Sequence, residues 1–195
     1  MIVTDYSGNI GGIESYTKSI TEELRSRGHI VSTFTSSKGT SRWLRYVGLI
    51  GTIGNIRFAI RLAQAISLQK PEVISLQSVM RAIGPIGLLP LLWYQGKICI
   101  TYHDLGYFVP YPTQILYESQ IGEFGWKRFS QDIHGPFSAV AIFAKYMNLV
   151  FLRAILRRAN VHLIPSAFLS TFVQSFYGDK APVQIVLHPH FNPHI

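Results

Sequence analysis

The sequence has little cysteine, few acidic residues and no uninterrupted apolar run long enough to be unambiguous. One cysteine, Cys99, among 195 residues excludes an internal disulfide, and with it a disulfide-held secreted scaffold. Only 10 Asp and Glu stand against 18 Lys and Arg, and charged residues make up 14% of the chain, too few for a basic nucleic-acid arm. A hydrophobic content of 48% excludes a disordered chain and suits one α/β domain.

The N-terminus, MIVTD, has no basic region followed by an apolar stretch, so we expect no signal peptide and a cytoplasmic location. The most membrane-like window, residues 136–156, contains Lys145 and Arg153, and Arg157 and Arg158 follow it. One charge near the middle of a membrane span costs roughly 2.5–3.5 kcal/mol. We therefore predict a buried or surface-lying amphipathic helix here and no span.

Strand-like runs alternate with helix-length stretches along the chain. Strands are expected at 2–4, 30–35, 73–77, 98–102, 161–164 and 183–187, and later helices at 88–94, 137–156 and 168–176. This alternation predicts an α/β domain with a Rossmann-like parallel sheet and helices on both faces. Helical spacing predicts two core-facing stripes, the first capped by Gly28: Ile13, Tyr16, Ile20 and Leu24, then Ile53, Ile56, Ile60, Ala63 and Ile66.

A glycine-containing turn, SGNIGGIE at residues 7–14, joins the first strand to the first helix. In an open parallel sheet this turn lies at the carboxyl end of the strands, where ligands bind. Gly11 and Gly12 lack a Cβ, so their backbone can take positive φ and let a phosphate approach the amides at the helix N-terminus. The spacing is neither GxGxxG nor a P-loop, which disfavours nicotinamide and simple NTPase functions. The alternative is a tight turn that needs glycine only for its dihedral angles.

Several segments follow one another in a recognisable order: GGIESY at 11–16 with GHIV at 28–31, PEVISLQ at 71–77, TYHD at 101–104, RRANVHLIPS at 157–166 and VQIVLHP at 183–189. Together they resemble the N-terminal, acceptor-side domain of family-four retaining glycosyltransferases with the GT-B fold. The resemblance covers nearly the whole chain and implies a single GT-B N-terminal domain over 1–195. In such enzymes a second Rossmann-like domain binds the nucleotide-sugar. We expect that domain to be absent from this chain.

The resemblance implies the acceptor-binding half of an enzyme of glycan biosynthesis, which transfers a sugar from a nucleotide-sugar to a glycan or lipid-linked acceptor. The expected partners are that acceptor and a separate donor-binding domain or chain, without which we expect no activity. The alternative is a non-catalytic binding module or partner subunit of a split glycosyltransferase. No cofactor is expected on this chain, and the nucleotide-sugar belongs to the complete enzyme. Three C-terminal histidines lack supporting ligands, so no metal site is expected there: His188, His190 and His194.

Four polar side chains are candidates for the site. His103 and Asp104 follow an apolar strand at the ligand edge, and the resemblance places His103 in the cleft as the catalytic candidate. A strand-end histidine bonded to a loop carbonyl is the alternative, and Asp104 either orients His103 or caps the next segment. Glu14 either binds the acceptor or stabilises the first helix through its dipole. Ser166 either reaches a ligand or caps the helix that follows it.

Cations alternate with aromatic rings at Arg42, Trp43, Arg45 and Tyr46. Trp and Tyr prefer the headgroup zone and Arg binds anionic lipid, so this stretch predicts peripheral binding to an anionic membrane surface, on its inner face. The alternative is an ordinary solvated helix face. Nucleic-acid binding by the same stretch is not expected, because its neighbours are apolar helices and no RNA-binding motif is present.

Overall fold

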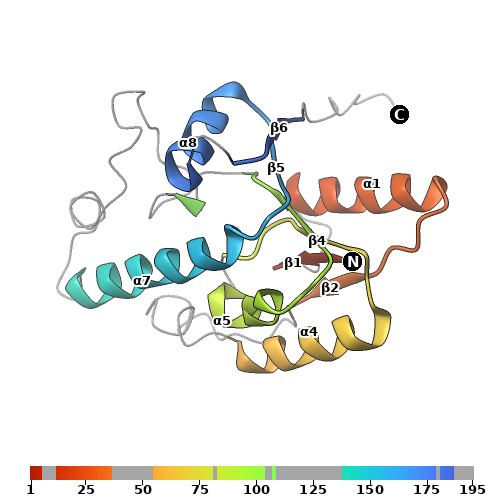
Figure 1. Cartoon of the computed structure of the whole chain (residues 1–195), viewed down its shortest axis with the longest axis horizontal. Coiled ribbons are helices and arrows are strands. Elements are labelled where there is room, and N and C mark those ends of the chain that lie inside the picture. Colours follow the sequence, from red (N-terminus) through yellow and green to blue (C-terminus); the bar gives the residue numbers. More distant parts are fainter. Residues whose placement is uncertain are drawn as a thin grey trace.

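The computed structural model describes residues 1–5, 12–36, 55–80, 83–103, 107–108, 138–178 and 181–186. Six parallel strands form one sheet in the order β2-β1-β3-β4-β5-β6 (Figure 1). Their bounds are β1 Ile2–Thr4, β2 Thr33–Thr35, β3 Val73–Leu76, β4 Lys97–Thr101, β5 Val161–Ile164 and β6 Val183–Ile185. All six predicted strands are present, which confirms the α/β fold class. β2 begins later than predicted, and Ile30 before it is fully exposed.

The strand order reverses direction at β1. On one side Ile2 lies opposite Thr33 of β2, and on the other side it lies opposite Ser75 of β3. The chain therefore runs from β1 outward to β2, returns past β1 to β3, and continues to β6. The carboxyl ends of β1 and β3 border this reversal, which is the position where open α/β sheets bind ligands.

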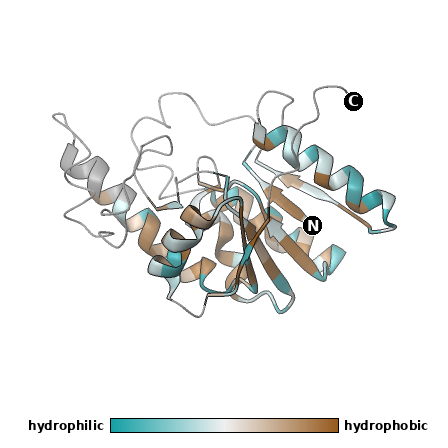
Figure 2. Cartoon of the chain, turned by 90° about the horizontal axis from the view of Figure 1, so that it is seen from above, coloured by the Kyte–Doolittle hydropathy of each residue, from teal (hydrophilic) through white to brown (hydrophobic). Residues whose placement is uncertain are grey.

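Helices cover both faces of the sheet, as predicted. Figure 1 shows α1 on one side and α4, α5 and α7 on the other, and Figure 2 shows apolar strands between the helices. The helix predicted at 88–94 is instead a short α-helix followed by a 3-10 helix that contains Pro90, which has no N–H to continue α-helical bonding. The bounds are α1 Gly12–Ser26, α4 Ile56–Gln69, α5 Gly84–Leu88, η1 Leu89–Leu92, α7 Ser138–Leu156 and α8 Ala167–Tyr177.

Helix α1 packs through threonines more than its apolar pattern predicts. The four apolar side chains of the predicted stripe are half-buried, whereas Thr17 and Thr21 are buried. The Thr17 hydroxyl donates to the carbonyl of Ile13 at 2.7 Å, and the Thr21 hydroxyl donates to that of Thr17 at 2.6 Å. Because each hydroxyl bonds to the preceding turn, threonine can occupy the buried face without an unsatisfied donor.

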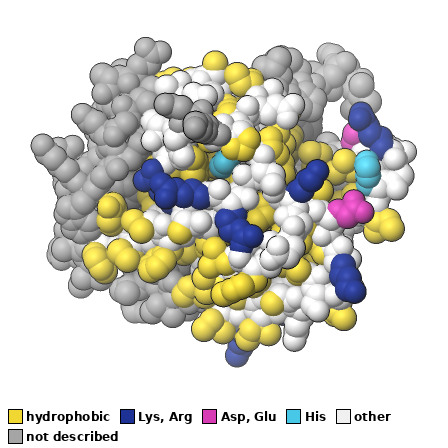
Figure 3. Space-filling view, viewed as in Figure 1, with side chains coloured by type: hydrophobic (Ala, Val, Ile, Leu, Met, Phe, Trp, Pro, Cys, Tyr) yellow, Lys and Arg dark blue, Asp and Glu magenta, His cyan; other side chains and the backbone are white. Residues whose placement is uncertain are grey.

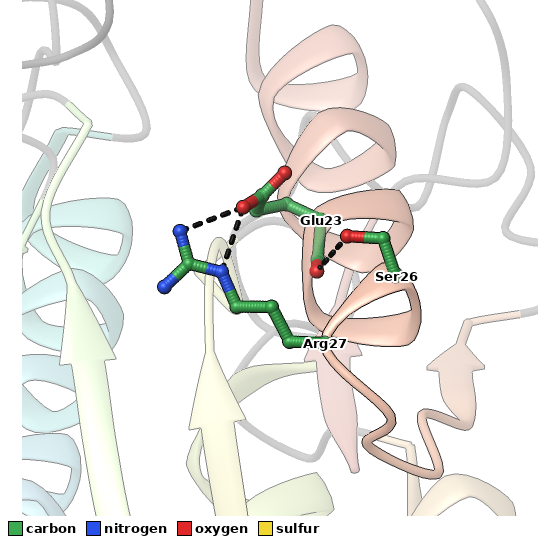
Figure 4. A network of polar contacts seen from close by, with 3 residues as sticks. All are labelled: Glu23, Ser26 and Arg27. Carbon is green, nitrogen blue, oxygen red and sulfur yellow. Dashed lines mark hydrogen bonds and ion pairs between the residues drawn. The ribbon is translucent and has the colours of Figure 1, made fainter.

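The C-terminal turn of α1 is held by polar contacts and a glycine. Gly28 has φ +85°, which confirms the predicted left-handed cap. The Arg27 guanidinium, just before Gly28, is paired with the Glu23 carboxylate one turn back at 2.7 Å, and the Ser26 hydroxyl donates to the Glu23 carbonyl (Figure 4). This exposed end faces away from the carboxyl ends of the strands, so these contacts stabilise the helix and not the candidate site.

Helix α4 buries a different face from the predicted one. Phe58, Leu62 and Ala65 are buried, whereas Ile56 and Ile60 of the predicted stripe are 59% and 55% exposed. The stripe at Ile56 and Ile60 is therefore wrong. Apolar residues occur on nearly every side of this helix, so spacing alone does not select the face that packs.

Helix α7 confirms the helix predicted in the membrane-like window. It contacts α5 on the same side of the sheet and carries buried Leu152 and Ile155. The Arg153 guanidinium lies 4.3 Å from the centre of the Phe176 ring of α8, which joins the two helices. Among the helices in the described part of the chain, none combines the length and apolarity needed to span a bilayer.

Candidate functional site

The parallel topology brings the ends of several strands to one edge of the sheet, and polar side chains follow each of them. Asp5 follows β1, Gln77 follows β3, His103 follows β4 after one residue, and Ser166 follows β5 after one residue. Gly12, the first residue of α1, lies near the same edge because α1 follows β1. The topology therefore places the predicted His103 and Ser166 at the edge where ligands bind.

A hydrogen bond and an aromatic contact hold the His103 ring. Its Nε2 lies 2.9 Å from Oε1 of Gln77, within hydrogen-bond distance. On another side the Tyr16 ring meets the imidazole edge-on, with ring centres 5.0 Å apart and planes at 71°. The side chain is half-buried. One partner of the ring is thus a side-chain amide.

Gln77 was not among the predicted site residues, although its side chain is completely buried at the end of β3. Its amide nitrogen donates to the Ser75 hydroxyl at 2.8 Å, and its backbone N–H donates to the carbonyl of Val3 at 3.0 Å. The Tyr107 hydroxyl donates to its backbone carbonyl at 3.4 Å. The only sequence signal was a polar residue directly after an apolar strand, on the edge that also carries His103.

Tyr16 was predicted to face the core, and its half-buried ring lies against His103. Burial raises the pKa of the Tyr16 phenol, nearby Cys99 raises it further, and the hydroxyl of Thr101 opposes the change. The phenol is therefore uncharged at neutral pH. It adds an uncharged polar group and a flat apolar surface beside the imidazole.

Asp5 is a second residue that the pattern did not reveal. Its carboxylate is buried, and Oδ1 accepts a hydrogen bond from the backbone N–H of Ile83 at 2.8 Å. Its own N–H donates to the carbonyl of Ser78. These bonds attach the end of β1 to the segment that leads into α5, so Asp5 fixes the relative position of the two strand ends at the reversal.

The first turn of α1 carries Gly12 and the half-buried Glu14. Gly12 does not have the positive φ that its role in the turn predicts, because it is already the first helical residue. No described atom lies within 4 Å of the position that a Cβ would occupy there. The position of Glu14 matches the favourable place for a carboxylate in the helix dipole.

Ser166 is the N-cap of α8. Its hydroxyl oxygen accepts a hydrogen bond from the backbone N–H of Leu169 at 3.2 Å, and its backbone is extended as N-caps require. The capping alternative for Ser166 is therefore present in the structure. Binding of a ligand by this exposed residue stays a prediction.

The remaining predicted residues lie outside the described part of the chain. They are Gly11 of the turn, Asp104 after His103, the C-terminal histidines, and the basic and aromatic stretch Arg42, Trp43, Arg45 and Tyr46. Within the described ranges, no group of three or more His, Cys, Asp or Glu side chains is placed to hold a metal ion.

A second histidine, His162, lies inside the sheet and has a different environment. Its Nδ1 is 2.9 Å from the Tyr102 hydroxyl, and its ring lies 4.8 Å from that of Tyr177. Burial lowers the pKa of His162 to about 4, and burial also raises the pKa of both tyrosines. This cluster is uncharged near neutral pH and belongs to the core.

The groups collected at the edge are an imidazole, a phenol and, at the first turn of α1, a carboxylate and backbone N–H groups. Such groups form hydrogen bonds with hydroxyl-rich ligands, and the helix N-terminus favours an anion.

Residues 10–190 match the family model described as Glycosyltransferase Family 4. Searches of curated proteins and of solved structures give no match.

Proposed function

The chain belongs to glycosyltransferase family 4, and on this basis we propose that it forms the acceptor-binding side of a retaining glycosyltransferase with the GT-B fold. The observation that carries the proposal is the contact of His103 with Gln77 and Tyr16 at the carboxyl edge of the sheet, beside the strand-order reversal. The sheet edge supplies one wall of a binding site. A second domain, on the same or a separate polypeptide, supplies the wall that binds the nucleotide-sugar.

In this proposal His103 accepts a hydrogen bond from a sugar hydroxyl. Glu14 and Asp104 bind acceptor hydroxyls, Ser166 adds a hydroxyl at the end of β5, and the Gly11-Gly12 turn faces the donor phosphate at the N-terminus of α1. The charge that develops on the phosphate is stabilised there by backbone N–H groups and the helix dipole. These groups act on a charge that grows during the reaction, so they lower the barrier.

The transfer itself needs no base from this chain. The bond between the anomeric carbon and the phosphate oxygen breaks, and a bond from that carbon to the acceptor oxygen forms on the same face. The acceptor proton passes to the departing phosphate oxygen. The chain contributes orientation and hydrogen bonds, so it has no transferase activity without the donor-binding domain.

The test is transfer from labelled UDP- and GDP-sugars to membrane-lipid and glycan extracts, with the donor-binding domain supplied. We expect His103→Ala to lower the transfer rate about fivefold to a hundredfold, because a buried hydroxyl left without its hydrogen-bond partner costs about 1–3 kcal/mol. His29→Ala is the matched control, since His29 is exposed near the far end of α1. Efficient turnover by the chain alone, or an unchanged rate in His103→Ala, contradicts the proposal.

We further propose that the acceptor is lipid-linked and that the chain works at an anionic membrane surface. On α7, Phe143, Val150 and Phe151 are 57%, 43% and 54% exposed, and their spacing places them on one helix face. Exposed Arg157 and Arg158 follow at the end of the helix. Figure 3 shows apolar and basic side chains side by side on the face of the molecule that includes α7. This combination is typical of interfacial surfaces.

A further inference from the structure

We propose that Gln77 is the positioning residue for His103: its amide oxygen holds the imidazole in the tautomer that carries the proton on Nε2. The inference rests on the proposed function, because it assigns a partner to the histidine of that site. It starts from the distance of 2.9 Å between Nε2 of His103 and Oε1 of Gln77. An amide oxygen only accepts hydrogen bonds, so the imidazole nitrogen that faces it must carry a proton. Nδ1 is then the basic nitrogen of the neutral ring.

The other end of the amide is also held. The Gln77 nitrogen donates to the Ser75 hydroxyl at 2.8 Å, and the amide oxygen faces His103. Ser75 lies in the middle of the sheet, opposite Ile2 of β1 and Cys99 of β4. Its backbone N–H also donates to the carbonyl of Met1 at 2.9 Å. The Ser75 hydroxyl, which accepts the hydrogen bond from the Gln77 amide, is therefore held in place by the strands on both sides of β3.

Burial makes this contact specific. The Gln77 side chain has no exposed surface, so water does not compete for its oxygen. A buried amide oxygen without a donor is unfavourable, and His103 supplies the donor. On the other side the Tyr16 ring restricts rotation of the imidazole, and Tyr16 is uncharged at neutral pH. The ring is thus held on two sides, by a hydrogen bond and by an aromatic contact.

The position of Gln77 also separates its role from that of a substrate-binding residue. Its side chain is buried behind the imidazole, and it acts on the reaction only through the ring that it holds. Orienting His103 was one of two predicted roles for Asp104, the residue that follows it. If Gln77 holds the imidazole, replacing Gln77 changes the proton on Nε2 and replacing Asp104 does not. This difference provides the test.

The test follows the His103 imidazole by NMR in the 15N-labelled full chain at neutral pH, with the signals assigned by their loss in His103→Gln. We expect a protected proton on Nε2 in the wild type. It should disappear in Gln77→Leu, which removes the acceptor, and persist in Asp104→Asn and in the exposed control Gln95→Leu. In Gln77→Glu the proton should persist and the pKa of His103 should rise by about one unit, because a carboxylate stabilises the imidazolium.

Several outcomes overturn the inference. They are a proton on Nδ1 in place of Nε2, a protected proton that survives in Gln77→Leu, or loss of that proton in Asp104→Asn. If Gln77→Leu does not fold, Gln77→Glu decides, because a folded Glu variant without a rise in the His103 pKa contradicts the hydrogen bond. A role of Gln77 in packing alone does not predict that Gln77→Glu raises the pKa of His103.

A transfer assay with the donor-binding domain supplied separates this inference from the proposed function. A reduced rate in Gln77→Leu, partly restored in Gln77→Glu, supports positioning. If His103→Ala has no effect on transfer while the NMR results hold, the proposed function of His103 fails and the tautomer assignment stands. If His103→Ala lowers transfer and Gln77→Leu leaves both transfer and the Nε2 proton unchanged, positioning fails and the proposed function stands.

Discussion

His162 and His103 show how differently one residue type can behave in the same sheet. His162 lies in the middle of β5 with 1% of its surface exposed, whereas His103 lies beyond the end of β4 and is half-buried. Desolvation disfavours the charged imidazolium, which is why the pKa of His162 falls to about 4. A neutral His162 is therefore part of the folded state, and His103 lies at the candidate site.

The buried histidine predicts how stability depends on pH. Because the folded pKa of about 4 is below the ordinary value of 6.5, the neutral form is favoured by folding. The stabilisation is fully present above pH 6.5 and is lost as the pH falls toward 4. The loss amounts to at most about 3 kcal/mol, using 1.36 kcal/mol for each pKa unit. Denaturant unfolding at pH 7 and at pH 4 measures it.

The comparison for this measurement is His162→Gln, which keeps a polar side chain beside the Tyr102 hydroxyl but does not titrate. We expect this variant to be less stable at pH 7 and to lose less stability than the wild type between pH 7 and pH 4. His29→Gln, at an exposed position, should follow the wild type. Identical pH dependence of wild type and His162→Gln would show that His162 is not the responsible group.

At the residue scale, the sequence predicted where His103 lies but not what it contacts. Its position after an apolar strand placed it at the ligand edge, because all strands of a parallel sheet end on the same side. Gln77 is 26 residues away, and its hydrogen bond depends on the direction of a side chain inside the folded sheet. Tyr16 fits an apolar helical stripe, so its pattern gave no reason to expect contact with an imidazole.

At the scale of the element, helix ends follow from local chemistry while buried faces do not. Backbone angles and hydrogen bonds to nearby residues set three helix ends: Gly28 follows α1, Lys70 ends α4 and Ser166 begins α8. The roles of Gly28 and Ser166 were predicted. The face that α4 buries depends on what α5 and the sheet present to it. A helix that is apolar around most of its circumference leaves several faces available, and packing selects one.

Helix α4 provides a direct comparison of two apolar side chains in one helix. Phe58 is 1% exposed and packs against Phe34 of β2, with ring centres 5.0 Å apart, whereas Ile60 is 55% exposed. We expect Phe58→Ala to reduce the free energy of unfolding by about 3–5 kcal/mol, the usual range for a buried aromatic residue. Ile60→Ala should change it by less than about 0.5 kcal/mol, as expected for a surface substitution.

Urea unfolding followed by circular dichroism measures both values. The two positions share a helix and differ by one turn at most, so the difference between them reports burial and not helix propensity. If Ile60→Ala is as destabilising as Phe58→Ala, the face of α4 assigned to the core is incorrect, and the stripe expected from spacing is the buried one.

At the scale of the whole molecule, the proposed membrane surface makes a prediction about binding. We expect the chain to float with phosphatidylglycerol vesicles at low salt and to release partly near 1 M salt, where the screening length falls to about 3 Å. Replacing Phe143 and Phe151 by Ser should weaken binding, because it removes apolar area from α7. Reversing the charge of Arg42 and Arg45 should also weaken it and reduce the dependence on salt.

Ile30→Ser is the matched control for this experiment, since Ile30 is fully exposed and far along the chain from α7. Its variant should float like the wild type. Absence of salt-sensitive binding to the anionic vesicles contradicts a membrane surface on this chain. Binding that is equally strong in the α7 variant and weakened only by the arginine changes would place the surface at Arg42 to Tyr46.

The overall architecture was the easiest level to predict. Six apolar runs separated by helix-length stretches allow few arrangements other than a parallel sheet with helices on both faces. The order of the strands, with the reversal at β1, does not follow from spacing. It requires knowledge of which strands pair, and therefore of contacts between distant parts of the chain.

The contact of His103 with Tyr16 and Gln77 has a consequence for the way the protein folds. Tyr16 comes from α1, Gln77 from the end of β3 and His103 from the end of β4, so no short segment contains the site. A parallel sheet also has no hairpins, and its pairings close long loops, which makes them late and slow to form. In a nascent or partly assembled chain the candidate site is consequently incomplete until α1, β3 and β4 have come together.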